Sequence, residues 1–190
     1  MDMFLNALIF ILTLILTARF FRRDGSWSLS NGVVAFRYFT VLSNVLCAVS
    51  ALLMCFSPSL IWVWTLKYIG TAAVTVTMLT VFLLLGPNMG YKKLLTGTDL
   101  YMHLVTPLLA ILTFFCFEKR EMSFQTALLG VLPVLLYGIL YLYKVIYAPE
   151  NRRWDDFYGF NMGGRWPISF AAMLMGGLAI SMLFLFLQNR

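Results

Sequence analysis

The single histidine of the chain, His103, has an aspartate four residues before it and a proline four residues after it. Histidine is the side chain whose ordinary pKa lets it exchange protons near neutral pH. Asp99 lies one helical turn away, where a carboxylate can fix the imidazole tautomer as in a catalytic triad. Pro107 has no N–H for the carbonyl of His103, so a helix can kink there. We therefore predict a general base oriented by Asp99. The alternative is a structural histidine bonded to a neighbouring helix.

A base needs a nucleophile, and Thr40 is the best candidate. Thr40, Ser43 and Asn44 are spaced by three or four residues, so they share one face of a helix. A threonine hydroxyl is inert until an adjacent base takes its proton, which here would be the task of His103. Asn44, Ser43 and Tyr38 are candidates to donate a hydrogen bond to an oxyanion. Alternatively, these polar residues only bond neighbouring helices together.

Transmembrane helices must position these residues. The chain has 190 residues, of which 61% are hydrophobic and 12% charged, and its mean hydropathy is +0.85. Soluble domains are roughly half apolar and one quarter charged. Long uncharged runs predict an all-α polytopic membrane protein, a bundle of six transmembrane helices in one integral membrane domain, residues 1–190. The predicted spans are residues 3–20, 32–56, 61–85, 98–117, 123–147 and 167–187.

Glycines and prolines divide the spans. We expect Gly86-Pro87-Asn88 to end the third span and Pro149 to stop the fifth, whereas Pro167 stands where a helix tolerates proline, in its first turn. Even-numbered spans all begin on one side of the membrane. The polar residues near residue 40, those near His103, and a cluster just before the last span should therefore meet at one depth.

The segment 147–167 mixes Trp, Tyr, Asn, Gly and Arg. One interpretation is an interfacial aromatic belt with turns. The other is a lid over the site, in which Arg37 or Arg165 holds the carboxylate or phosphate of a lipid.

The net charge of +6 does not indicate nucleic acid, because the basic residues form short clusters between apolar runs. Most lie in the connections after the first, third and fifth predicted spans, so we expect these connections in the cytoplasm and both termini outside. The N-terminus has no basic region typical of a signal peptide, and we expect its first helix to be retained. The three cysteines lie in apolar runs, which predicts no disulfide framework, no metal site and no cofactor.

Two short motifs resemble a known family. Phe36-Arg37-Tyr38-Phe39-Thr40-Val41-Leu42-Ser43-Asn44 and His103-Leu104-Val105-Thr106-Pro107 resemble segments of the androgen-induced family of six-span membrane threonine hydrolases. Tyr158-Gly159-Phe160-Asn161 is similar to the pattern of bacterial relatives. The resemblance implies Thr40 and His103 as an intramembrane catalytic pair, and a bacterial cytoplasmic membrane as the location. Animal members hydrolyse fatty-acid esters of hydroxy fatty acids, and they place the proline five residues after the histidine, whereas here it is four.

The sequence thus predicts a lipid ester hydrolase whose partners are the bilayer and a lipid substrate. Thr40 would attack the ester carbonyl and His103 would take the proton. Three alternatives stay open: acyl transfer to a lipid hydroxyl at the same site, a small lipid or ion transporter, and a noncatalytic membrane scaffold.

Overall fold

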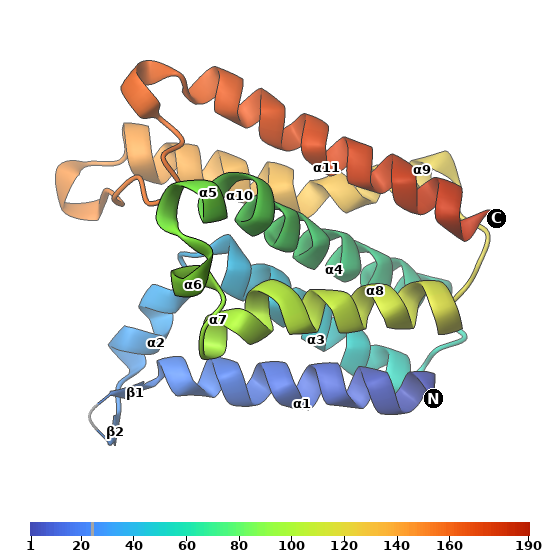
Figure 1. Ribbon diagram of the computed structural model, residues 1–190. Coiled ribbons are helices and arrows are strands. Elements are labelled where there is room, and N and C mark those ends of the chain that lie inside the picture. The colour runs from blue at the N-terminus through green and yellow to red at the C-terminus, as the bar shows by residue number, and fades with distance from the viewer. Residues whose placement is uncertain (24) are drawn as a thin grey trace.

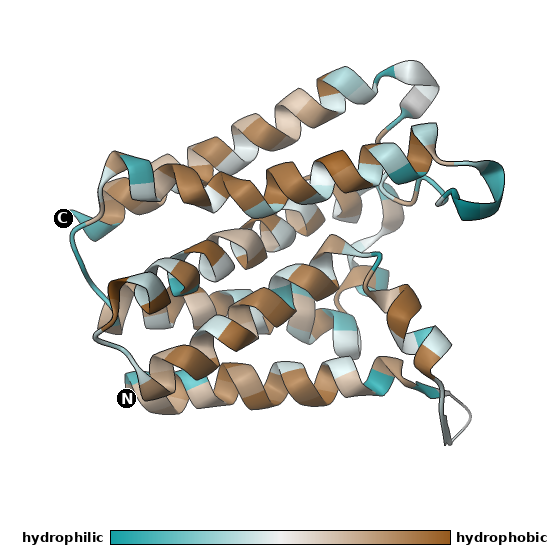
Figure 2. Ribbon diagram, turned by 180° about the vertical axis from the view of Figure 1, so that it is seen from behind, coloured by the Kyte–Doolittle hydropathy of each residue, from teal (hydrophilic) through white to brown (hydrophobic). Residues whose placement is uncertain are grey.

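The computed structural model describes residues 1–23 and 25–190. Among these residues, six helices are long and apolar enough to cross a membrane, as an integral membrane protein requires. Brown apolar residues run along these helices, and hydrophilic residues gather at their ends (Figure 2). The six segments are Asp2–Phe20, Phe39–Phe56, Ile61–Met89, Thr98–Phe117, Phe124–Tyr147 and Trp166–Gln188. The prediction of an all-α bundle of six spans is confirmed.

Four helices pack around one another and two more cover one side. The four are α1 (Asp2–Phe20), α3 (Phe39–Phe56), α4 (Ile61–Thr80) and α8 (Thr106–Phe117). Both α10 (Leu132–Leu142) and α11 (Trp166–Gln188) lie against α4 and against each other (Figure 1). The two termini lie at one end of the bundle, and the short elements that surround the candidate site lie at the other.

The short elements complete the chain between the long helices. They are β1 (Arg22–Arg23), β2 (Ser26–Trp27), α2 (Leu29–Ala35), π-helical η1 (Val81–Leu85), α5 (Gly86–Met89), α6 (Tyr91–Leu94), α7 (Thr98–Leu100), π-helical η2 (Tyr101–Val105), α9 (Phe124–Leu128), 3₁₀-helical η3 (Leu129–Val131), π-helical η4 (Tyr143–Tyr147), and the 3₁₀ turns η5 (Glu150–Arg152) and η6 (Met162–Gly164). The two-residue strands β1 and β2 pair antiparallel.

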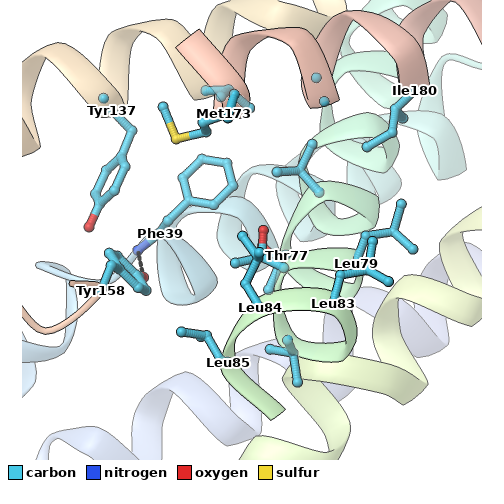
Figure 3. A pocket seen from close by; sticks show the side chains of 18 of the residues that line it. Phe39, Thr77, Leu79, Leu83, Leu84, Leu85, Tyr137, Tyr158, Met173 and Ile180 are labelled. Carbon is cyan, nitrogen blue, oxygen red and sulfur yellow. Dashed lines mark hydrogen bonds between the residues drawn. The ribbon is translucent and has the colours of Figure 1, made fainter. Parts of the chain in front are cut away.

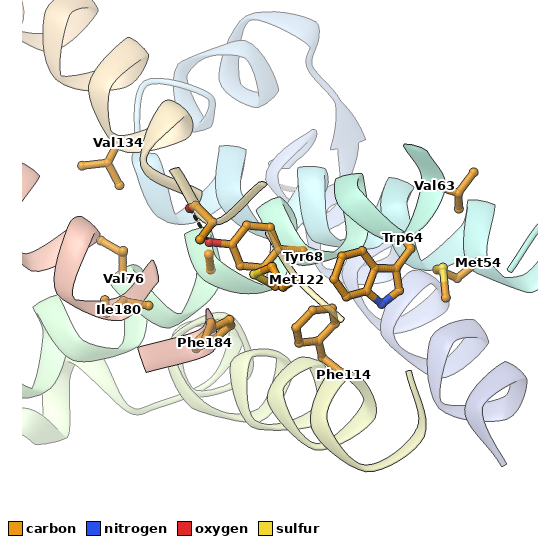
Figure 4. Close-up of a cluster of buried hydrophobic side chains, with 12 residues drawn as sticks. Met54, Val63, Trp64, Tyr68, Val76, Phe114, Met122, Val134, Ile180 and Phe184 are labelled. Carbon is orange, nitrogen blue, oxygen red and sulfur yellow. Dashed lines mark hydrogen bonds between the residues drawn. The ribbon is translucent and has the colours of Figure 1, made fainter. Parts of the chain in front are cut away.

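Four aromatic side chains lie at the centre of the largest buried cluster. Trp64 and Tyr68 of α4, Phe114 of α8 and Phe184 of α11 are buried together (Figure 4). Their polar atoms are satisfied, since the Trp64 indole donates to the carbonyl of Glu118 and the Tyr68 hydroxyl to that of Ala127. This core fixes α4, α8 and α11 relative to one another.

The predicted second span is interrupted before Thr40. Residues 36–38 continue from α2 as a turn, with N–H bonds to carbonyls three residues back, and Tyr38 is extended (φ −94°, ψ 132°). The helix α3 begins at Phe39 rather than at Gly32. Thr40 therefore lies in the first turn of a helix, where backbone N–H groups lack partners within the helix, and not in its middle.

The third span is longer than predicted. Gly86 and Pro87 do not end it, because the π-helical turn η1 leads into α5 and Pro87 occupies an allowed first-turn position there. The helix ends instead at Gly90, whose φ of +86° is a conformation that glycine adopts without strain.

Candidate active site at the start of helix α3

Thr40 and His103 meet between α3 and η2. The Thr40 hydroxyl lies 3.3 Å from Nε2 of His103, and Nδ1 of the same ring lies 2.7 Å from the carbonyl oxygen of Leu94. A carbonyl can only accept, so Nδ1 carries the proton and Nε2 is the free acceptor facing the threonine. The 3.3 Å separation is typical of a catalytic pair without substrate, where such bonds are often long. The imidazole is 6% exposed, which shields it from competing water.

The backbone around His103 explains how the ring reaches Leu94. Pro107 offers no N–H, and the chain forms the π-helical turn η2, in which Thr106 N–H bonds to the carbonyl of Tyr101. Before it, Gly97 with φ +58° turns the chain so that α6 returns over the imidazole. The kink expected at Pro107 is thus a widened helical turn that contains His103.

The N-terminal turn of α3 presents an anion-stabilising environment to Thr40. The N–H of Phe39 donates to the Tyr158 hydroxyl at 3.1 Å, and this hydroxyl also interacts with the side chains of Thr40 and Tyr137 (Figure 3). Unsatisfied N–H groups and the helix dipole favour negative charge at such an end. The Tyr158 hydroxyl therefore lies beside the place where an oxyanion on a group attacked by Thr40 would form.

Burial raises the pKa of Tyr158 to about 12, more than its hydrogen bond from Phe39 lowers it. The phenol therefore keeps its proton over the whole physiological pH range and can act as a hydrogen-bond donor. The sequence predicts that a cluster just before the last span lies at the depth of Thr40, but it gives Tyr158 no role. No periodicity connects residue 158 to residue 40, so only the folded chain shows which residue of that cluster contacts the start of α3.

A network of hydrogen bonds holds the segment that carries Tyr158. The Asp156 carboxylate accepts the N–H groups of Phe160 and Asn161 and the hydroxyl of Tyr141. The Tyr141 oxygen in turn accepts the N–H of Tyr158 at 3.1 Å. These bonds tie the segment to α10, so Tyr158 is positioned by folded structure over Thr40.

Ser43 and Asn44, predicted as oxyanion donors, contact the backbone of the nucleophile candidate instead. The Ser43 hydroxyl donates to the Thr40 carbonyl at 3.1 Å and pairs with the Thr77 hydroxyl at 2.8 Å. The Asn44 amide donates to the carbonyls of Thr40 (2.8 Å) and Met102 (3.0 Å). Both residues are buried, and they fix α3 against α4 and η2 rather than facing a substrate.

Asp99 does not orient the imidazole. It is exposed in the first turn of α7, and its carboxylate makes no hydrogen bond to any residue in 1–23 or 25–190. The carbonyl of Leu94 takes the role that the sequence predicted for Asp99. A main-chain carbonyl is present in every residue, so no side-chain pattern could have indicated Leu94. The backbone path through Gly97 decides this contact.

The other predicted candidates lie around the site. Tyr38 is exposed, and its ring packs on Phe157 with 4.6 Å between centroids. Arg37 is exposed and its carbonyl accepts the Tyr137 hydroxyl at 2.7 Å. Arg165 is exposed at the start of α11, where its carbonyl accepts the N–H of Ile168. The structure thus brings Thr40 and His103 into contact and leaves these three side chains at the periphery.

An apolar cavity of about 500 Å³ opens beside Thr40. Its volume falls in the range of roughly 300–1,000 Å³ that is usual for small-molecule sites. Apolar residues of α4, η1, α10 and α11 form most of its walls, and the lining also includes Thr40. Figure 3 shows Thr77, Tyr137 and Tyr158, which also line the cavity. Such a space suits a hydrocarbon chain with its polar end at Thr40.

A second buried polar cluster lies at the opposite end of the bundle. Lys67 Nζ donates to Asn6 Oδ1 at 2.6 Å, and Asn6 Nδ2 donates to Glu118 Oε1 at 2.6 Å. The exposed fractions are 0% for Lys67, 1% for Asn6 and 5% for Glu118. Burial raises the pKa of Glu118 more than the attraction of Lys67 lowers it. The cluster joins α1, α4 and the end of α8, at the other end of the bundle from the Thr40 site.

Within the described part of the chain, no group of three or more His, Cys, Asp or Glu residues could hold a metal ion. The cysteines Cys47, Cys55 and Cys116 are free thiols. The groups gathered at the candidate site are the side chains of Thr40, His103 and Tyr158 and the first N–H groups of α3.

Comparisons with known proteins add no relative: no family model, no curated protein and no solved structure matches the chain. The resemblance of the two short motifs to the androgen-induced membrane hydrolases stays a prediction.

Proposed function

We propose that the protein is an intramembrane lipid ester hydrolase in which Thr40 is the nucleophile and His103 the general base. The observation that carries the proposal is the Thr40–His103–Leu94 chain of contacts, in which the hydroxyl faces the unprotonated imidazole nitrogen. A nucleophile beside a base that a third group orients is the arrangement required for covalent acyl catalysis.

The reaction would proceed in two steps. Thr40 Oγ1 attacks the ester carbonyl while His103 Nε2 takes its proton, and the oxyanion forms near the N–H groups of Phe39 and Thr40. Tyr158 retains its proton and turns it toward the same oxyanion. The tetrahedral adduct collapses to acyl-Thr40 as His103 protonates the departing alcohol. Water then attacks, giving its proton to His103, and release of the acid returns that proton to Thr40.

The apolar cavity supports an acyl chain as the group that is transferred. With the carbonyl at Thr40, the chain would extend between η1, α10 and α11 and exchange water for apolar walls. The alcohol half would lie at the opposite side of Thr40, toward the membrane surface. Fatty-acid esters of hydroxy fatty acids fit this description. If a lipid hydroxyl replaced water in the second step, the same site would catalyse acyl transfer.

The test is an esterase assay on the purified protein in detergent with acyl esters of graded chain length. Both free acid and transesterified product are measured. Thr40→Ala and His103→Ala should each lower kcat/KM by at least 10³-fold, as losses of triad members do. Thr80→Ala is the matched control, because Thr80 also lines the cavity but has no bond to His103. It should retain activity.

Chemical trapping gives a second readout that needs no natural substrate. A fluorophosphonate with an alkyl chain should label Thr40, detected by peptide mass spectrometry, and His103→Ala should abolish the labelling. Inactivity of the wild-type protein on every ester, together with absence of labelling, would refute the hydrolase proposal. A flux assay in liposomes would then test transport.

A further inference from the structure

Two positive charges share one tryptophan ring beside the candidate site. The guanidinium carbon of Arg37 and the Nζ atom of Lys144 each lie 5.8 Å from the centroid of Trp154. The backbone N–H of Trp154 donates to the carbonyl of Lys144 at 2.9 Å, which ties the backbone of Trp154 to η4. Cation–π attraction stabilises each cation there but leaves both charges in place.

Neither charge has a counter-ion among the residues that the structure describes. Across residues 1–23 and 25–190, no carboxylate lies within 4.0 Å of Arg37 or Lys144, and the one ion pair found joins the N-terminus to Asp2. Asp156 lies in the same segment, but its oxygens accept two N–H groups and the hydroxyl of Tyr141. Two unneutralised cations around one partly buried ring attract an anion to this position.

The basic pair adjoins the Thr40 end of the cavity. Arg37 precedes Thr40 by three residues, and its carbonyl accepts the hydroxyl of Tyr137, which lines the cavity. Trp154 lies 6.4 Å from the ring of Tyr141, another lining residue. Tryptophan and cationic side chains at a helix end are typical of the headgroup level of a bilayer. The anion would therefore sit where lipid headgroups are.

We propose that Arg37 and Lys144 form a binding site for the anionic group, a phosphate or carboxylate, of a membrane lipid. Trp154 holds the two cations together, and the acyl chains of the bound lipid lie along the apolar surface toward the cavity. For a lipid that is also the substrate, the inference rests on the proposed hydrolase function. It then predicts that the substrate is an ester whose half outside the cavity carries a negative charge.

The experiment measures lipid binding without any turnover. The protein is released from nanodiscs that contain equal amounts of phosphatidylglycerol and phosphatidylcholine, and the retained lipids are counted by native mass spectrometry. The wild type should retain phosphatidylglycerol in preference. Arg37→Gln with Lys144→Gln should reduce this preference roughly 30-fold, or about 2 kcal/mol at 1.4 kcal/mol per factor of ten. Lys144→Gln alone should reduce it by part of this factor.

The matched control removes the same charge elsewhere at this end of the bundle. Lys92→Gln with Arg152→Gln, both exposed, should leave the preference unchanged. An equal loss in both double variants would assign the preference to overall surface charge and refute the site. An unchanged preference in Arg37→Gln with Lys144→Gln would refute it as well.

Two further arms separate the possible sources and the two proposals. Inorganic phosphate at millimolar concentration, added without lipid, should not stabilise the protein. A melting shift that needs Arg37 and Lys144 would assign the site to a soluble anion and refute the lipid assignment. Thr40→Ala should bind phosphatidylglycerol like the wild type. Failure of the hydrolase proposal would therefore show in the esterase assay, and failure of the lipid site in the binding assay.

Discussion

Replacement of Asn6 by leucine should destabilise the protein more than any other single apolar substitution on α1. Asn6 bridges Lys67 and Glu118 through two 2.6 Å hydrogen bonds, and both partners are buried. A hydrogen bond to a charged group contributes roughly 1.5–3 kcal/mol, and Asn6→Leu removes two such bonds while their partners stay buried. We therefore expect Asn6→Leu to lower the free energy of unfolding by about 3–5 kcal/mol.

The assay is reversible unfolding in mixed micelles with SDS, followed by tryptophan fluorescence. Thr13→Val is the matched control on the same helix, because Thr13 is 2% exposed but its hydroxyl has no partner among the described residues. Loss of this hydroxyl in Thr13→Val should leave the free energy of unfolding unchanged or raise it. In the Asn6→Leu background, Lys67→Met with Glu118→Leu should recover most of the stability, since an all-apolar cluster leaves no charge unpaired. A cost below about 1 kcal/mol for Asn6→Leu would refute the reasoning.

Three other outcomes follow from the geometry. Tyr158→Phe should lower kcat on acyl esters about 10²–10³-fold, as loss of one oxyanion donor does. Its melting temperature should stay within a few degrees of the wild type. An unchanged kcat would exclude a role for the phenol. Gly177→Leu should shift esterase preference toward shorter acyl chains, because a side chain there meets Val134 at the cavity wall, whereas Gly177→Ala makes only ordinary van der Waals contact and should keep the wild-type profile. The folded state binds a proton at Glu118 more tightly than the unfolded state does. The free energy of unfolding of the wild type should therefore fall as pH rises above the ordinary pKa of 4.5. Glu118→Gln should flatten that pH dependence in unfolding titrations.

Hydropathy alone determined the architecture of this protein. A stretch of about 20 apolar residues has one stable state in a bilayer, a helix with all its backbone hydrogen bonds satisfied internally. The number of spans and most of their ends therefore follow from local composition. The sequence also predicted that Thr40 and His103 lie at one depth, because both residues stand near the starts of even-numbered spans, on one side of the membrane.

Local composition could not fix the details that would make Thr40 reactive. The break at Tyr38, which places Thr40 in the first turn of α3, lies inside what hydropathy predicts as one continuous span. The π-helical turn η2 and the positive φ of Gly97 bring the Leu94 carbonyl, and not Asp99, to the imidazole.

Only the tertiary structure decided the contacts between distant segments. Tyr158 contacts Phe39 across 119 positions of the chain, and the Trp154 ring contacts one cation from η4 and one from the turn before α3. Asn6 and Lys67 are isolated polar residues within apolar sequence, Glu118 begins the charged run 118–121, and nothing in their spacing pairs them. The physical reason is that sequence periodicity reports which face of a helix is buried, whereas the rotation and depth of each helix against its neighbours decide which polar groups meet there.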